Sequence, residues 1–109
     1  YTIMAAYKIL GNSAPAATTD TTLVTGSTNG TVISSFTACN TSGNNDSIRV
    51  ALVPNGGTLG TSNYVYYNFT VPSGSTIQET PGWTLESGAT LHVYSNSGYI
   101  TFIATGATL

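Results

Sequence analysis

Few side chains in this chain of 109 residues could act as an acid, a base or a thiol nucleophile. Besides four carboxylates there are one histidine and one cysteine, namely Asp20, Asp46, Glu79, Glu86, His92 and Cys39. A hydrolase needs a nucleophile, a base and a group that orients the base. His92 lies in an alternating segment, on the side opposite Leu91 and Val93, and its nearest carboxylate in the sequence, Glu86, is separated from it by a turn. The sequence therefore predicts no catalytic site, and we expect that the chain is not an enzyme.

The same residues predict no cofactor site. One histidine and one cysteine cannot complete a zinc site. The scattered carboxylates lack the alternating spacing of a calcium-binding loop. No glycine-rich loop leads into the Lys-Ser/Thr pair that phosphate binding needs. Cys39 has no partner for an intrachain disulfide, and we interpret it as a small apolar strand residue.

Charged residues are scarce. They make up 6% of the chain, against roughly 25% in ordinary soluble domains. With Lys8 and Arg49 as the only cations and a net charge of −2, binding to nucleic acid is disfavoured, because it requires clustered cations. No apolar run approaches the ~20 residues of a membrane span, and anionic lipid offers no attraction. Thr, Ser, Asn and Gly supply the polarity, which suits a protein packed against copies of itself or a partner.

The elements that would position these residues are strands. Short alternating runs are separated by turns rich in Gly, Pro and Asn, which is typical of β-structure. We predict about eight strands, with ends uncertain by ~2–4 residues: Thr21–Thr25, Val32–Cys39, Ser47–Val53, Tyr64–Val71, Thr76–Glu79, Trp83–Leu85, Leu91–Tyr94 and Tyr99–Ala104. This spacing predicts an antiparallel β-sandwich over residues 21–109, of jelly-roll or immunoglobulin-like type. Residues 1–20 lack alternation and predict an extended arm that orders only against another surface.

Alternation also assigns residues to faces. Ile48, Val50 and Leu52 should share one face, and Arg49, Ala51 and Val53 should lie on the other. In the second strand Val32, Phe36 and Ala38 should share one face. In Tyr64–Val71, four residues should share one face, namely Val65, Tyr67, Phe69 and Val71, and Tyr64 and Tyr66 should lie on the other.

The tyrosines on strands permit two interpretations. They could pack across neighbouring strands at the surface, or they could contact another subunit, because tyrosine buries a large ring while its hydroxyl still bonds water or backbone. The hypothesis of an assembly contact involves the following residues: Tyr7, Ile9, Leu10, Pro15, Tyr64, Tyr66 and Tyr94.

Several short motifs resemble those of a known family. They are Tyr7–Gly11, Ser13–Thr18, Ala38–Asn40, Arg49–Ala51, Val53–Pro54, Tyr64–Tyr67, Gly82–Leu85 with the Ser87–Gly88 turn, and Tyr99–Ala104. From Ala5 to Leu109, their order and spacing resemble those of small virion structural proteins of tailed bacteriophages, cyanophages included.

This resemblance implies an all-β subunit of the virion. Its partners would be the major capsid protein or other virion subunits, and it would form a homo-oligomer, with a trimer favoured. Capsid cement (decoration) protein fits the residues best, and a tail, baseplate or fibre subunit is the alternative. From a different class, a carbohydrate-binding module would need coplanar exposed aromatics, for which Tyr64, Tyr66 and Tyr94 are the candidate set.

Overall fold

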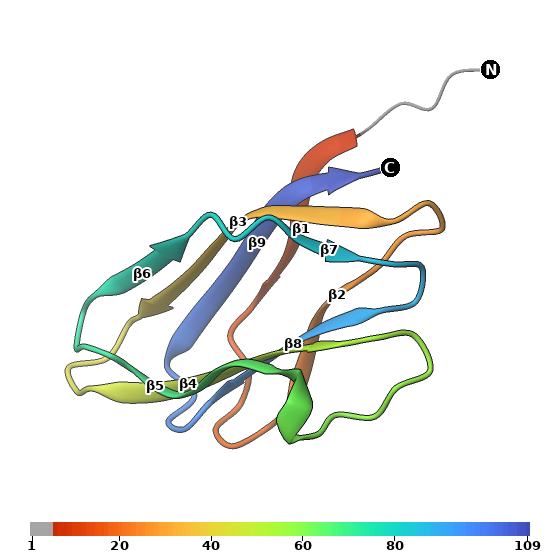
Figure 1. Cartoon of the computed structure of the whole chain (residues 1–109). Coiled ribbons are helices and arrows are strands. Elements are labelled where there is room, and N and C mark those ends of the chain that lie inside the picture. Colours follow the sequence, from red (N-terminus) through yellow and green to blue (C-terminus); the bar gives the residue numbers. More distant parts are fainter. Residues whose placement is uncertain (1–5) are drawn as a thin grey trace.

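The computed structural model describes residues 6–109, which form nine β-strands and one short helical turn (Figure 1). The strands are β1 (Ala6–Ser13), β2 (Thr21–Thr25), β3 (Thr31–Asn40), β4 (Asp46–Val53), β5 (Tyr64–Val71), β6 (Thr76–Glu79), β7 (Trp83–Leu85), β8 (Thr90–Ser95) and β9 (Ile100–Thr108). The helical turn η1 (Thr61–Asn63) is the only helix in this part of the chain, and it is far too short to cross a membrane.

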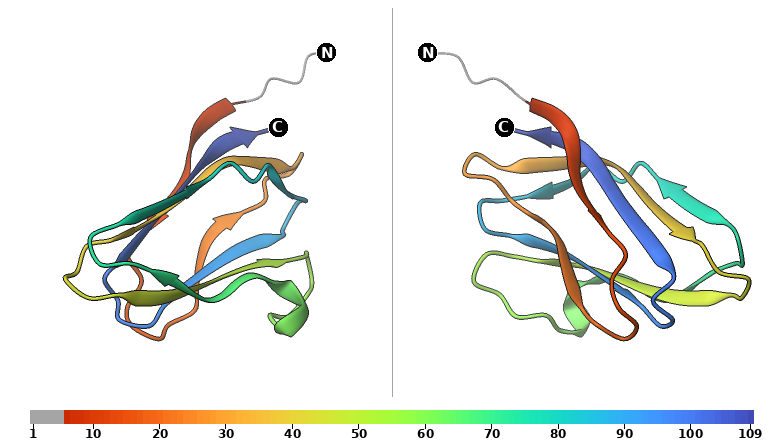
Figure 2. Two further views of the ribbon diagram at one scale, coloured as in Figure 1. Left: turned by 60° about the vertical axis from the view of Figure 1, so that its left-hand side comes forward. Right: turned by 180° about the vertical axis from the view of Figure 1, so that it is seen from behind.

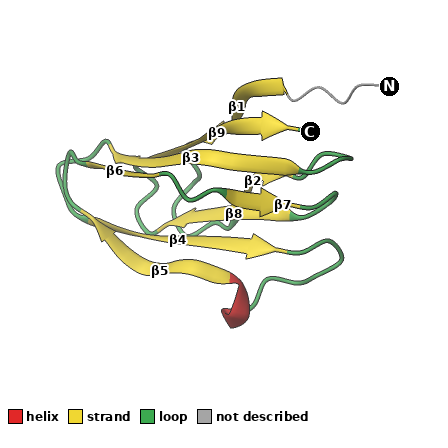
Figure 3. Cartoon of the chain, turned by 45° about the horizontal axis from the view of Figure 1, so that its top comes forward, coloured by secondary structure: helices red, strands yellow, loops and turns green. Residues whose placement is uncertain are grey.

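The strands form two antiparallel sheets packed face to face (Figures 2 and 3). The five-stranded sheet has the order β1-β9-β3-β6, with β7 also paired to β3. The four-stranded sheet has the order β2-β8-β4-β5. Apart from the β4–β5 and β6–β7 connections, each strand passes to the other sheet, as in the two Greek keys of a jelly roll. The predicted β-sandwich is therefore confirmed, and its strand order is that of the jelly roll.

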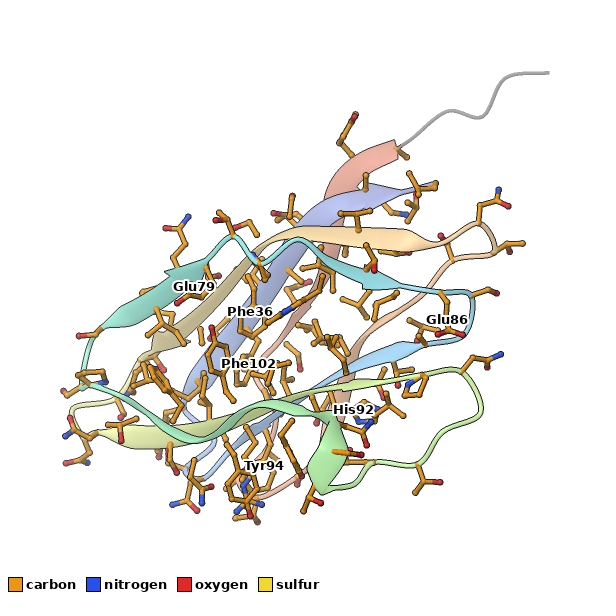
Figure 4. All side chains as sticks on the ribbon, in the orientation of Figure 1. Phe36, Glu79, Glu86, His92, Tyr94 and Phe102 are labelled. Atoms are coloured by element: carbon orange, nitrogen blue, oxygen red, sulfur yellow. The ribbon has the colours of Figure 1, made fainter. Side chains whose placement is uncertain are left out.

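The core fills the space between the sheets. Phe36 of β3 and Phe102 of β9 are fully buried, with ring centroids 6.0 Å apart, and Figure 4 shows both between the two layers. From the other sheet, Ile48, Val50 and Leu91 point toward them and are fully buried. Each such side chain contributes about 1.5–3 kcal/mol on burial. The faces predicted for β4 and β8 are thus confirmed.

The prediction of an arm over residues 1–20 is wrong for the residues that the structure describes. Residues 6–13 form β1, an edge strand paired antiparallel with β9. Residues 14–20 lead to β2, and the Thr18 N–H donates to the Ser95 carbonyl. The alternation of β1 escapes detection because a bulge between Ile9 and Gly11 interrupts it. The first five residues of the predicted arm lie outside the described residues.

β-Bulges also make the predicted assignment of side chains to faces wrong in two strands, β3 and β5. In β3 the register shifts between Ile33 and Ser35. Ile33 is therefore the inward partner of Phe36 and Ala38, whereas Val32 faces outward. Alternation assumes a period of two, and one extra residue reverses every side chain beyond it.

In β5 the register against β4 shifts twice. Tyr66 pairs with Val50 and Phe69 with Ile48, so both lie on the inner side, with their ring centroids 5.3 Å apart. Tyr64 and Tyr67 lie together on the outer side, with centroids 4.9 Å apart. The predicted grouping of Tyr64 with Tyr66 is therefore wrong.

Candidate functional site

The outer face of the five-stranded sheet is a broad surface with no charged side chain among the described residues. Its outward positions follow from the strand registers and, for Ser34, from the lining of a depression on this face: Tyr7, Ile9, Asn12, Val32, Ser34, Ser35, Thr37, Cys39, Thr76, Gln78, Thr84, Thr101, Ile103, Thr105 and Ala107. Lys8 lies on the other side of β1 from Tyr7 and Ile9. We call this surface the uncharged face.

Exposed apolar side chains gather at the β1 side of the uncharged face. Tyr7 is 85% exposed and Ile9 65% exposed, and Ile103 of β9 also reaches solvent. Beside Tyr7, a shallow depression of about 250 Å³ is lined by Val32, Ala107 and Leu109 together with Tyr7 itself. Large apolar residues that reach this degree of exposure together are typical of a surface that contacts another protein.

The outer face of the four-stranded sheet has the opposite character. Here the Arg49 guanidinium lies over two aromatic rings, with its carbon 4.5 Å from the centroid of Tyr67 and 4.6 Å from that of Tyr94. The Nε–H of Arg49 donates to Asn68 Oδ1 at 2.8 Å. Cation–π contacts with two rings hold the guanidinium in place. We call this group, formed by Arg49, Tyr67, Asn68 and Tyr94, the arginine stack.

The tyrosines of this region do not form a flat platform. The rings of Tyr64 and Tyr67 are inclined at 73°, and Tyr67 and Tyr94 each turn one face to the Arg49 guanidinium. Tyr66 belongs to the inner side, where its ring centroid lies 6.4 Å from that of Trp83. The three tyrosines considered for sugar stacking therefore do not share one surface.

A hydrogen-bonded chain of three side chains crosses the same outer face. His92 Nδ1 lies 2.7 Å from Asp20 Oδ2, and His92 Nε2 lies 2.8 Å from Thr90 Oγ1. Because a carboxylate only accepts, Nδ1 donates to Asp20, and in the neutral ring Nε2 accepts from the Thr90 hydroxyl. Figure 4 shows His92 and Tyr94 on the side of the sheet that faces away from Phe36 and Phe102.

Sequence reasoning considered only Glu86 as a neighbour of His92 and did not identify the carboxylate that contacts it. Glu86, its nearest carboxylate in the sequence, lies in the β7–β8 turn, whereas Asp20 comes from the segment before β2. The pairing of Thr22 with His92 brings Asp20 near. An acid, an imidazole and a hydroxyl in this order occur in catalytic triads. Here the hydroxyl belongs to a half-buried threonine on a sheet surface, and the depression beside Tyr7 lies on the opposite sheet.

The seven residues of the assembly hypothesis are distributed over different places. Tyr7 and Ile9 lie exposed on the uncharged face. Leu10 packs against the core, and Pro15 is buried, so neither is a free contact surface. The remaining three are half-buried: Tyr64 and Tyr94 lie on the outer face of the four-stranded sheet and Tyr66 on its inner side. Cys39 is half-buried in β3, on the uncharged face.

Asp20, Asn68 and Ile103 are among the contributors to these surfaces that sequence reasoning missed. The only local signal for Asn68 is its residue type, because asparagine tolerates the positive φ of 51° that it adopts here. Asp20 and Ile103 depend on pairing between distant strands. Comparison with protein-family models, with curated proteins and with solved structures found no match to this chain. Its function is therefore inferred from the geometry and the surface chemistry of its two faces.

Proposed function

We propose that this protein is a structural subunit of a bacteriophage virion, and most directly a cement protein that binds the assembled capsid shell. The uncharged face is the observation that supports this best. A surface of hydroxyls, amides and exposed apolar groups can be buried against a neighbour without removing ions from water. Tyr7 and Ile9 are the anchors of this contact, because they expose the most apolar area there.

A cement protein stabilises a shell because it binds the assembled state and not the free coat subunits. The rigid sandwich supplies a fixed surface, and the proposed partner is the major capsid protein. Self-association into a trimer would multiply weak contacts with the shell into tight attachment. The jelly-roll strand order is compatible with this role, since the same architecture occurs in capsid domains, although a fold alone does not define a function.

Occupancy of assembled shells tests this proposal. Purified protein is mixed with shells of the phage whose genome carries this sequence, and the bound fraction is measured by sedimentation and located by cryo-electron microscopy. We expect binding to shells and none to free coat protein. Exclusive localisation to the tail would replace the cement role by that of a tail subunit, and absence from both would contradict the proposal.

Paired variants then test the contact surface. The double variant Tyr7→Ser/Ile9→Thr removes both exposed anchors. It should weaken shell binding by about thirtyfold or more, because each anchor residue costs about 1–2 kcal/mol or more. Tyr99→Ser is the matched control, since Tyr99 is comparably exposed but lies in the β8–β9 turn. Both proteins should unfold at the wild-type temperature. Wild-type occupancy by the double variant would show that the uncharged face is not the contact.

A carbohydrate-binding module is the second candidate function, because jelly rolls also occur in lectins. The exposed ring of Tyr67 is the feature that favours it. A glycan array probed with the free domain distinguishes the two functions. Specific glycan binding that is lost in Tyr67→Ala, together with no attachment to shells, would establish the second function in place of the first.

A further inference from the structure

Arg49 presents unused hydrogen-bond donors at a fixed position. Its guanidinium has N–H groups on Nε, Nη1 and Nη2, and only the one on Nε has an acceptor among residues 6–109. In that part of the chain no buried side-chain nitrogen or oxygen lacks a partner. The Nη1 and Nη2 groups therefore reach solvent, although Arg49 as a whole is half-buried.

The carboxylates of the chain are engaged or located elsewhere. Asp20 lies 2.7 Å from His92, and Asp46 accepts from the hydroxyl of Ser97. Glu79 of β6 interacts with Tyr66, and Glu86 lies in the β7–β8 turn. Within the described residues, Arg49 consequently has no carboxylate partner.

The surroundings of Arg49 limit its motion. The guanidinium carbon lies over the rings of Tyr67 and Tyr94, and Asn68 Oδ1 accepts from its Nε–H. Asn68 holds this position in a left-handed conformation, with φ of 51°, inside a strand. A non-glycine residue in that region is uncommon and carries a conformational cost. The result is an arginine whose side-chain entropy is already restricted before any ligand arrives.

We propose that the arginine stack binds a carboxylate side chain of a neighbouring subunit, which pairs with the Nη1 and Nη2 groups in a planar, two-point contact. This inference rests on the proposed function, since it names the chemistry of one virion contact. A phosphate of nucleic acid is disfavoured because Lys8 and Arg49 are the only cations, and such binding requires several. The contact uses the sheet opposite to the uncharged face, so one subunit could touch two neighbours.

Acetate serves as the probe for the free protein. It is titrated against the full chain at constant ionic strength, with chloride as the exchanged anion, and followed by NMR of the Arg49 Nε–H and the Tyr67 and Tyr94 rings. We expect saturable shifts at these positions, and at least tenfold weaker binding in Arg49→Lys, which keeps the charge but loses the planar fork. Wild-type affinity in Arg49→Lys, or no saturable shift in the wild type, would overturn the proposal.

Two further variants make the result specific. Lys8→Gln removes the other cation and should leave acetate binding unchanged. Asn68→Gly permits the same backbone conformation but removes the acceptor for Nε–H, and should weaken acetate binding severalfold. If Arg49→Lys only lowered the unfolding temperature and left the shifts intact, the arginine stack would be structural and not a binding site.

Shell occupancy separates this inference from the proposed function. Wild-type attachment with equal attachment of Arg49→Lys would refute the arginine contact and leave the cement role standing. Failure of the wild type to attach, with acetate binding intact, would refute the cement role and leave a carboxylate site for a different protein partner. Loss of attachment in Arg49→Lys, with acetate binding weakened in parallel, would support both.

Discussion

Tyr66 and Glu79 belong to different sheets, and their interaction spans the open side of the sandwich between β5 and β6. The pKa of Tyr66 is raised above its ordinary value. Burial is the larger cause, and the negative charge of Glu79 is the second. Both effects disfavour the phenolate in the folded protein. The unfolded chain has neither effect, so it releases this proton at a lower pH.

Tyr66→Phe should therefore change how stability depends on alkaline pH. Below the ordinary tyrosine pKa of about 10 both states keep the Tyr66 proton, so this group adds no pH dependence. Above it, the unfolded state loses the proton first, and the free energy of unfolding falls until the folded-state pKa is passed. Urea unfolding near pH 8 and above pH 10 should show a smaller loss in Tyr66→Phe than in the wild type. Glu79→Gln, which removes only the second cause, should fall between them, and identical losses in all three would contradict this assignment.

Single residues were predictable from the sequence only where local pattern decides their surroundings. His92 was correctly placed opposite Leu91 and Val93, because β8 is regular. Its contact with Asp20 was not predictable, since it depends on the register between β2 and β8, strands that lie far apart in the sequence. The arginine stack was missed for a similar reason, because a backbone irregularity at Asn68 brings Tyr67 over Arg49.

Among the elements, β1 is the strand that the sequence pattern did not predict. It covers the edge of β9 and meets β2 of the other sheet at Gly11. A methyl group at this position would collide with the Leu23 carbonyl oxygen in β2. The added Cβ at position 11 and the Leu23 carbonyl oxygen are both held in place by the backbone, so neither can move without shifting a strand.

Gly11→Ala should therefore destabilise the protein by about 1–3 kcal/mol, as is usual for forced overpacking. Gly43→Ala is the matched control, because a methyl group there meets nothing within 4 Å, and it should remain within about 0.5 kcal/mol of wild type. Urea unfolding followed by tryptophan fluorescence measures both. An equal effect of the two substitutions would show that the β1–β2 approach does not limit stability.

The other strands show how far pattern reasoning reaches. The predicted ranges Thr21–Thr25, Tyr64–Val71, Thr76–Glu79 and Trp83–Leu85 coincide with observed strands, because Gly and Pro turns bound most of them. The last strand was predicted to end at Ala104 but continues to Thr108. The small residues of Thr105–Thr108 give no alternating signal, and their pairing with β1 and β3 extends the strand.

Considered as a whole, the molecule has two chemically different faces. The ionisable residues Asp20, Arg49 and His92 share the outer face of the four-stranded sheet, and the other sheet offers an uncharged face of hydroxyls and apolar groups. A contact through the uncharged face involves no ion pair, and one through the arginine stack involves a single pair. Added salt should therefore weaken these contacts only slightly, because they contain at most one charge pair that salt could screen.

Attachment to shells should consequently depend weakly on ionic strength. Between about 50 mM and about 500 mM salt we expect the dissociation constant to change by less than about threefold, since only one charge pair is at stake. Sedimentation binding across this range measures it, with Arg49→Gln expected to remove the remaining salt dependence. A steep loss of binding in moderate salt would point to a different, charged contact surface.

The antiparallel pairing of β1 with β9 has a practical consequence. Ala6 lies directly opposite Thr108, so the start of β1 and the end of β9 lie at the same corner of the sandwich (Figures 1 and 2). Cargo fused at either end would thus be displayed from one site, beside Tyr7. A short peptide joining these ends would also permit a circular permutant opened at an exposed turn such as that around Gly56, with every strand pairing retained.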